Sequence, residues 1–131
     1  MIGDVDPRAV ETAKLITDAG GRAISQRTNV TNSDEVKALV DRAVAEYGSM
    51  DIAFNNAGLL PSTAPFVEQT EADWHKTIAV DVTGVFLAMK HQLAHMVSVG
   101  HGAIINTTSV AGLRADPAWR PMWRQSMRWW G

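Results

Sequence analysis

The sequence predicts an α/β fold in which short parallel strands are joined by crossover helices. Over residues 1 to 108, brief apolar runs alternate with longer segments whose apolar residues recur every three or four positions. Glycines follow the helical segments, and glycine is the residue at which helices commonly end. At 131 residues, the chain has the length of one domain at most.

The pattern begins with a strand over residues 1 to 5. Asp6 and Pro7 then predict the N-cap and first turn of a helix. The glycines at 20 and 21 can end that helix in a left-handed conformation. A second strand is expected over residues 22 to 27.

A capping box predicts the start of the second helix, because Asn32 and Glu35 stand three residues apart ahead of an apolar pattern. The apolar positions at helical spacing are Val36, Leu39, Val40, Ala43, Val44 and Tyr47. Gly48 is expected to close this helix. A short strand over residues 51 to 54 follows and leads into the turn at residues 55 to 58.

A long helix is expected from about Glu71, with its apolar residues on one face and a break at residues 101 and 102. The residues of that face are Trp74, Ile78, Val82, Val85, Phe86, Met89, Leu93 and Met96. The last strand, over residues 103 to 107, has the apolar start expected of a strand buried on both faces.

Composition excludes several classes of protein. The chain has no cysteine, so disulfides, thiolate metal sites and a cysteine nucleophile are excluded. It has no run of 18 apolar residues and no signal-like start, so we expect a cytoplasmic protein. Residues 1 to 117 carry 9 basic and 14 acidic side chains, whereas 118 to 131 carry three arginines, no acid and four of the five tryptophans. We therefore predict a domain over 1–117 and an aberrant tail over 118–131.

Ligands of open parallel sheets bind beyond the carboxyl ends of the strands. The residues found there are Asp4, Asn29, Val30, Asn55, Asn56, Ala57, Gly58, Thr107, Thr108 and Ser109. The Asp4 carboxylate could accept hydrogen bonds from both hydroxyls of an adenosine ribose, and it would repel a 2′-phosphate, which favours NAD over NADP. The alternative is that Asp4 or Asp6 only caps the following helix.

Two further groups of residues have open alternatives. In the run from Asn55 to Gly58, small residues permit close approach of a flat ligand and the amides can fix strand ends or a ribose, but the run could be a plain turn. His91 and His95 have the spacing of a metal pair, but no acidic third ligand follows and Lys90 adjoins them. We expect no metal there, but a surface facing solvent or another subunit.

Taken together, these residues resemble the short-chain dehydrogenase/reductase family. The markers, in order over residues 1 to about 117, are Asp4, Asn29-Val30-Thr31, Asn55-Asn56-Ala57-Gly58, the segment from Val80 to Phe86, and the segment from Ile104 to Gly112. The resemblance implies a partial Rossmann-like, doubly wound parallel sheet. It also implies an NAD(P)-dependent oxidoreductase that interconverts a secondary alcohol and a carbonyl compound by hydride transfer.

The resemblance assigns roles to particular residues. It makes Asp4, Asn29, Val30, Asn56, Ala57 and Gly58 contacts of the cofactor, NAD or NADP. Ser109 becomes the hydroxyl that hydrogen-bonds the substrate oxygen. Asp81 falls where the family has an active-site asparagine, and a carboxylate accepts hydrogen bonds but cannot donate them. The alternative for Asp81 is a helix residue that faces water.

The family pattern is incomplete at both ends of this chain. The family's first strand and glycine-rich turn would precede Met1, so we expect the sheet to lack the strand between the pair in residues 1–27 and the pair in residues 51–108. The family's catalytic tyrosine and lysine would lie thirteen and seventeen residues after Ser109, where Met122 and Ser126 stand.

A change of reading frame near Pro117 would explain the tail. With CGN codons for the arginines and an AGY codon for the serine, reading residues 118 to 131 from the third base of each codon permits Met-Ala-Pro-Tyr-Val-Ala-Ala-Lys, with tyrosine and lysine at the family's positions. We therefore expect a truncated, frameshifted and catalytically impaired chain, whose parent acts on a small-molecule alcohol or ketone.

Two other functions are possible for the chain as it stands. A non-catalytic module could assemble with itself or with an intact relative through the helix over residues 71–97. The tail could bind anionic membranes, because Arg120, Arg124 and Arg128 are four residues apart, but Pro121 interrupts that stretch. We expect no membrane partner, and the acidic body of the chain disfavours nucleic acid.

Overall fold

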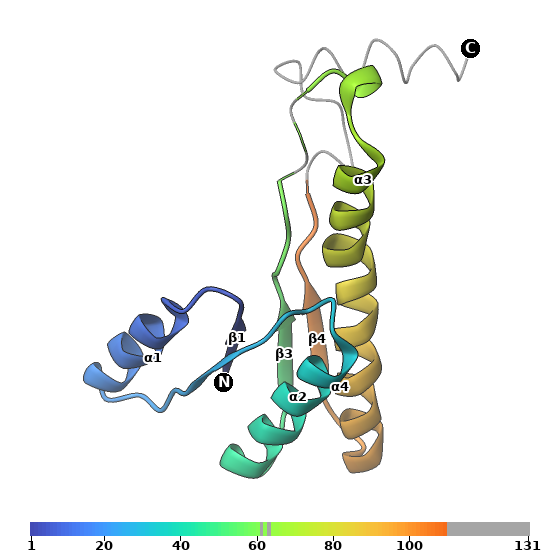
Figure 1. Cartoon of the computed structure of the whole chain (residues 1–131). Coiled ribbons are helices and arrows are strands. Elements are labelled where there is room, and N and C mark those ends of the chain that lie inside the picture. The colour runs from blue at the N-terminus through green and yellow to red at the C-terminus, as the bar shows by residue number, and fades with distance from the viewer. Residues whose placement is uncertain (61, 63, 110–131) are drawn as a thin grey trace.

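The computed structural model describes residues 1–60, 62 and 64–109. The predictions for residues 110–131, including the tail, lie outside the described residues. The helices and strands in chain order are β1 (Ile2–Asp4), α1 (Ala9–Asp18), β2 (Ser25–Arg27), α2 (Ser33–Tyr47), β3 (Ile52–Asn55), a 3₁₀ turn (Phe66–Glu68), α3 (Glu71–Ile78), a π-helical turn (Ala79–Gly84), α4 (Val85–Val99) and β4 (Ala103–Asn106) (Figure 1).

The strands of the described residues form two separate parallel sheets. β1 pairs with β2, with Ile2 opposite Ser25, and β3 pairs with β4, with Ile52 opposite Ala103. Each pair is connected through a helical crossover, as the sequence predicts. The expected gap between the two pairs is present as well, because β1 and β3 are not hydrogen-bonded to each other.

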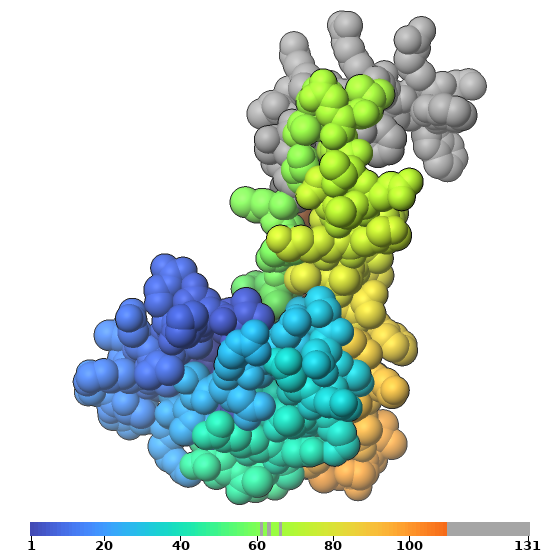
Figure 2. Space-filling model, viewed as in Figure 1, coloured from blue at the N-terminus to red at the C-terminus, as the bar shows by residue number. Residues whose placement is uncertain are grey.

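The core lies between α2, β3 and α4, which pack together. Its buried apolar side chains are Val36, Val40, Ala43, Ala53, Ala88 and Met96. α1 lies beside β1 and β2 and adds Ala13 (Figure 1). Figure 2 shows the yellow-green segment around α3 extending away from the blue and teal segments.

The start of α1 differs from its prediction, whereas its end matches. Asp6 Oδ1 accepts a hydrogen bond from the backbone N–H of Arg8 at 2.8 Å, but the N-cap position of the helix is Arg8, which makes no side-chain cap hydrogen bond. The regular helix begins only at Ala9, after a turn in which the Ala9 N–H donates to the Asp6 carbonyl. At the other end, Gly20 has φ +86°.

The capping box at α2 is only half formed. Asn32 Oδ1 accepts hydrogen bonds from the backbone N–H groups of Asp34 and Glu35, at 2.9 and 3.2 Å. The Glu35 carboxylate does not return to the Asn32 N–H, because that N–H already donates to the Asn29 carbonyl at 3.0 Å. Glu35 Oε2 instead accepts from the Asn29 N–H at 2.8 Å.

The long helix differs from its prediction in continuity and in its end. It is divided into α3 and α4 by the π-helical turn, and α4 ends at Gly100 (φ +78°) rather than at residues 101 and 102. The Gly100 N–H donates to the Met96 carbonyl at 2.9 Å and so closes the last turn.

The predicted apolar face of this helix is only partly buried. α4 buries Ala88, Gln92 and Met96, whereas Trp74 and Phe86 are 60% and 63% exposed. The buried residues of α4 are spaced four apart, so they lie on the side of the helix that meets α2 and β3. One of them is a glutamine. The prediction that the last strand is buried on both faces is wrong, because Ile105 is 53% exposed.

Candidate functional site

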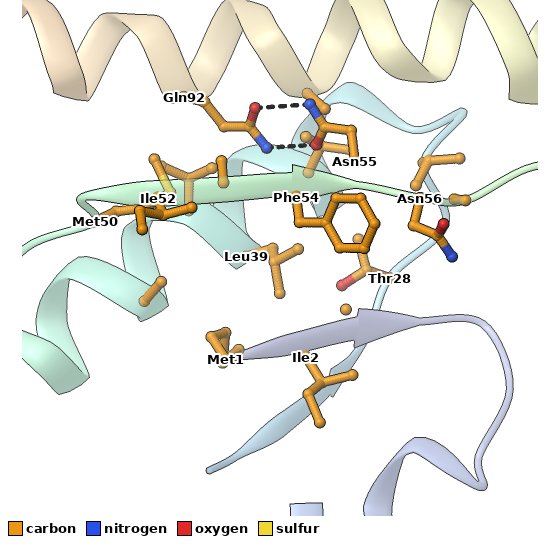
Figure 3. A pocket seen from close by; sticks show the side chains of 18 of the residues that line it. Met1, Ile2, Thr28, Leu39, Met50, Ile52, Phe54, Asn55, Asn56 and Gln92 are labelled. Atoms are coloured by element: carbon orange, nitrogen blue, oxygen red, sulfur yellow. Dashed lines mark hydrogen bonds between the residues drawn. The ribbon is translucent and has the colours of Figure 1, made fainter. Parts of the chain in front are cut away.

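The carboxyl ends of β1 and β3 border one groove, of about 750 Å³, between the two sheets (Figure 3). Four of the predicted cofactor contacts line it: Asp4, Val30, Asn56 and Ala57. The other two, Asn29 and Gly58, are the chain neighbours of Val30 and Ala57. The structure therefore brings together residues that are more than fifty positions apart in the sequence.

Asp4 is exposed at the end of β1. Its Oδ1 accepts a hydrogen bond from the Asp6 N–H at 2.9 Å, and its backbone carbonyl accepts one from the Thr28 N–H at 2.9 Å. These bonds fix the turn after β1 against β2. The N-cap position of α1 is Arg8, which makes no side-chain cap hydrogen bond, so Asp4 does not cap this helix; Asp4 and Asp6 each accept a backbone N–H in the turn that precedes it.

Asp6 and Arg8 form an ion pair beside Asp4. The Arg8 Nε donates to Oδ1 and Oδ2 of Asp6 at 3.0 and 2.9 Å. The side-chain hydrogen bonds from Arg8 lower the pKa of Asp6 to about 2. The Arg8 guanidinium is therefore directed toward Asp6.

The turn after β2 is held by its own side chains. Asn29 Oδ1 accepts hydrogen bonds from the backbone N–H and the hydroxyl of Thr31, at 3.0 and 2.9 Å. Val30 packs against the π-helical turn so closely that a Cβ on Gly84 would lie 2.9 Å from Val30 Cγ2. Glycine at position 84 permits this approach.

Asn55, the last residue of β3, and Asn56, which follows it, have different partners. The side-chain amides of Asn55 and Gln92 form a reciprocal pair, with N···O distances of 2.7 and 3.0 Å (Figure 3). Asn56 Oδ1 accepts a hydrogen bond from the hydroxyl of Thr107 at 2.8 Å. Asn55 thus ties β3 to α4, and Asn56 ties the groove to the residue that follows β4.

Asp81 does not face water from a regular helix, as one alternative had it. It is half-buried in the π-helical turn, and its Oδ1 accepts a hydrogen bond from the Leu59 N–H at 2.8 Å. The carboxylate thereby holds the loop that follows Gly58. π-Helical turns within α-helices are frequent at functional sites. A part of Asp81 in proton transfer stays a prediction.

Ser109 lies three residues beyond β4 and is exposed. The hydrogen bond between Thr107 and Asn56 places the start of this segment beside the turn after β3. Its assigned role toward a substrate oxygen stays a prediction.

Of the two surroundings predicted for His91 and His95, a surface that simply faces solvent is contradicted, because both side chains are half-buried and have partners within the chain. His91 Nε2 lies 3.0 Å from the Ser33 hydroxyl, and His95 Nε2 accepts a hydrogen bond from the Met50 N–H at 3.3 Å. Both rings therefore join α4 to α2 or to the chain before β3. Within the described ranges, no group of three metal-ligating side chains is found.

Three contributors to this region were missed from the sequence. Gln92 had a signal, as a lone polar residue four positions from the apolar Ala88 and Met96. The capping box predicted that the Glu35 carboxylate accepts a hydrogen bond from the Asn32 N–H, but it accepts one from the Asn29 N–H. Tyr47 lines the groove, and its Oη is buried without a hydrogen-bond partner among the described residues. The Arg22 guanidinium lies 5.3 Å from the centroid of its ring.

Parallel strands, helical crossovers and a polar carboxyl edge define a Rossmann-like α/β protein. The sequence model of the short chain dehydrogenases matches residues 1–121. The chain belongs to the short-chain dehydrogenase/reductase family.

Its relatives include dehydrogenases of ring alcohols. The chain is 47% identical over 112 residues to cis-4-hydroxycyclohexanecarboxylate dehydrogenase of Sinomonas cyclohexanicum, covering 86% of this chain and 45% of the relative. It is 34% identical to cyclohexanol dehydrogenase of Acinetobacter sp. (strain SE19), with coverages of 86% and 45%.

The solved structure of NAD⁺-bound xylitol dehydrogenase superposes with a TM-score of 0.83, at 30% identity, over 91% of this chain and 46% of that one. The chain thus spans about half the length of the relatives it matches. None of the described helices is long and apolar enough to cross a membrane.

Proposed function

We propose that this chain carries two walls of the nicotinamide dinucleotide site of an alcohol dehydrogenase, whose reaction interconverts a secondary alcohol and a ketone. The observation that supports the proposal is the common groove lined by Asp4, Val30, Asn56 and Ala57 at the carboxyl ends of β1 and β3. A carboxylate, an amide and two apolar groups fit a ribose and a flat ring. The bound nicotinamide would supply the hydride acceptor, and these residues would bind and orient it.

The charges at the end of β1 favour NAD over NADP. Asp4 presents an exposed carboxylate that can accept ribose hydroxyls and would repel a 2′-phosphate. Two cations near Asp4 that could attract such a phosphate have acidic partners: Arg8 is hydrogen-bonded to both oxygens of Asp6, and Arg27, opposite Asp4 on β2, lies 3.4 Å from Glu35.

Two residues are proposed for the reaction itself. Ser109 would donate a hydrogen bond to the substrate oxygen, and Asp81 would position the loop after β3 through the Leu59 N–H. Residues 122 and 126 are methionine and serine rather than the family's tyrosine and lysine, so we expect slow turnover at best. Loss of general acid–base catalysis alone typically lowers a rate by about 10²–10⁴-fold.

Nucleotide binding is tested by following the backbone amide resonances of the full chain during titration with NAD⁺, NADP⁺ and AMP. We expect shifts at residues 4–8 and 29–31, with NAD⁺ binding more tightly than NADP⁺. Asp4→Ala should remove that difference, whereas Asp18→Ala, which removes an exposed carboxylate on α1, should not. Absence of shifts with NAD⁺ would contradict the site, and equal binding of both dinucleotides would contradict the preference.

Turnover is tested separately by nicotinamide absorbance. The panel should contain cyclohexanol, 4-hydroxycyclohexanecarboxylate and open-chain secondary alcohols, because two relatives are named for ring alcohols. We expect no turnover above background. Substantial turnover by the purified chain would contradict the proposed impairment but leave the binding site intact.

Assembly is a second candidate function, and exposed residues of α4 favour it. Phe86, Leu93 and Val97 are 63%, 43% and 77% exposed, at spacings of seven and four that place them on one side of the helix. We propose that this row joins the chain to a second copy or to an intact relative. Sedimentation velocity should detect the complex, and Phe86→Ser should weaken it while Leu15→Ser on α1 should not. A chain that stays monomeric with and without the relative would contradict it.

A further inference from the structure

The turn after β3 is tied at both of its ends to the long helical segment. It carries three of the predicted cofactor contacts, Asn56, Ala57 and Gly58. At its start, the side-chain amide of Asn55 pairs with that of Gln92 on α4. At its end, the Leu59 N–H donates to Asp81 Oδ1 at 2.8 Å. The two ties therefore bracket the turn.

Gln92 stands on the buried face of α4, between Ala88 and Met96, and is itself 8% exposed. An amide buried without hydrogen bonds costs free energy, and Asn55 supplies a donor and an acceptor at 3.0 and 2.7 Å. Apolar contacts are non-directional and would let a helix shift along a strand, whereas a reciprocal amide pair fixes one position. Gln92 therefore specifies where α4 meets the end of β3 (Figure 3).

The orientation of this amide pair is set by its neighbours. Met89 Sδ can only accept, and the Nδ2 of Asn106 donates to it at 3.4 Å. Asn106 Oδ1 then accepts from Asn55 Nδ2 at 2.9 Å, which leaves Asn55 Oδ1 for Gln92 Nε2. The row of amides thus has one direction, and it requires both a donor and an acceptor from position 92.

The same asparagine also holds the segment that follows β4. The Asn55 carbonyl accepts from the Thr107 N–H at 2.9 Å, and the Thr107 hydroxyl donates to Asn56 Oδ1 at 2.8 Å. A displacement of Asn55 would therefore move Asn56 and the start of the segment that leads to Ser109. Both of these residues have proposed roles toward the cofactor or the substrate.

We propose that Gln92 is a positioning residue for the nucleotide site, because through Asn55 it fixes the turn that presents Asn56, Ala57 and Gly58 to the cofactor. Asp81 fixes the same turn from its other end, so loss of Gln92 leaves one of two ties. This role rests on the proposed nucleotide site. The hold of Gln92 on the turn exists without a bound nucleotide.

Three variants of the full 131-residue chain test this role. Gln92→Met substitutes an apolar side chain of similar length and removes both hydrogen bonds to Asn55. Gln92→Glu is a conditional variant, because a protonated carboxyl group has one donor and one acceptor, as an amide has, whereas a carboxylate only accepts. Burial favours the protonated form, so the pair should form again as the pH falls. Met96→Val is the matched control, because it shortens a buried side chain one turn along the same face without removing a hydrogen bond to β3.

The first measurement is the order parameters of the backbone amides from ¹⁵N relaxation, without ligand. We expect Gln92→Met to lower them at residues 56–58 and to leave those at residues 29–31 unchanged. The second measurement is the Kd for NAD⁺ from the titration described above. We expect Gln92→Met to weaken NAD⁺ binding about tenfold, the size typical of one lost hydrogen bond. Met96→Val should stay within about twofold of wild type in both measurements.

Gln92→Glu gives the readout that a loss of packing would not move. It should resemble Gln92→Met at pH 8 and return to within about twofold of wild type at pH 5. Each value is compared with that of wild type at the same pH, so titration of the native groups cancels. Circular dichroism checks the fold of every variant at both pH values.

The outcomes separate this role from the nucleotide site itself. Equal NAD⁺ affinity in wild type and Gln92→Met would overturn the positioning role and leave the nucleotide site standing. So would an equal loss in Met96→Val, or a defect of Gln92→Glu that does not change with pH. Absence of NAD⁺ binding by the wild-type chain would overturn the nucleotide site and this role together.

Discussion

The β1–α1–β2 part and the α2–β3–α4–β4 part both contain a parallel strand pair, but they differ in what they bury. The second part contributes six of the seven buried apolar residues, and the first contributes only Ala13. α1 leaves Val10, Leu15 and Ile16 exposed, at 63%, 70% and 39%. Buried apolar area is the main source of stability, so the two parts should differ strongly in local stability.

The difference matters because the candidate site is divided between the two parts. Asp4, Asn29 and Val30 come from the weakly buried part, whereas Asn56 and Asp81 come from the well-packed one. The two parts meet where Leu39 packs against Gly3 and Val30 against Gly84, where the Asn29 N–H donates to Glu35, and where Arg22 lies over the Tyr47 ring. A site of this kind depends on how firmly the first part docks on the second.

The largest expected effect is on the free energy of unfolding, and it compares one substitution in each of the two parts. Met96→Ala removes a side chain that is 5% exposed and should lower the free energy of unfolding by about 2–5 kcal/mol. Leu15→Ala on α1 should change it by no more than about 0.5 kcal/mol. Urea unfolding followed by circular dichroism measures both, and comparable losses would contradict the contrast.

The contact between the two parts is tested at Gly84. Gly84→Ala places a Cβ 2.9 Å from Val30 Cγ2 and should destabilise the chain by about 1–3 kcal/mol. Val30→Ala in the same chain should recover part of that loss. A double-mutant cycle measures the coupling, and strictly additive effects would show that the parts do not touch there.

A smaller effect is expected at Asp81. Asp81→Ala removes the acceptor for the Leu59 N–H and should cost about 1 kcal/mol, with faster exchange of that amide. Asp81→Asn keeps an acceptor and should retain the protection. If the Leu59 amide were equally protected in wild type and in Asp81→Ala, Asp81 would not be a positioning residue for this loop.

The smallest effect is a pH dependence at Asp51 and His101, whose side chains lie 3.1 Å apart on the exposed corner between α4 and β3. Hydrogen bonds from Ser49 and then His101 lower the pKa of Asp51, and those with the Val99 carbonyl and then Asp51 raise the pKa of His101. The histidine contribution is complete below its ordinary pKa of 6.5 and is lost as the pH rises through the raised value.

The aspartate contribution is complete above its ordinary pKa of 3.8 and is lost as the pH falls through the lowered value. Urea midpoints of wild type and His101→Gln should therefore differ most between about pH 4 and pH 6, and less at pH 8. A difference that grows toward pH 8 would contradict the sign.

Local signals predicted the elements of this fold well. Short apolar runs between helical segments located the four strands of the described residues, and Asn32, Gly20 and Gly48 stand at helix ends as their chemistry requires. Which face of each element is buried depends instead on contacts between elements. The buried face of α4 includes Gln92 because a partner amide, Asn55, lies opposite it, and no periodicity in one segment reports on a partner 37 residues away.

Strand ends predicted that Asp4, Val30, Asn56 and Ala57 lie near one another, because carboxyl ends of parallel strands share an edge, and all four line one groove. Their roles toward a cofactor stay predictions. The anchoring of Asp81 on Leu59 and of Glu35 on Asn29 could not be predicted, since each depends on how a loop returns to a helix.

Amide hydrogen exchange of the unliganded chain tests most directly whether two parts of unequal stability border an open groove. The amides of α2, α4 and Asn55 should exchange slowly, those of α1 and β2 faster, and those of Gly3, Ile52 and Phe54 at nearly unprotected rates. Uniform protection across both parts, with Gly3, Ile52 and Phe54 as slow as Asn55, would contradict the account.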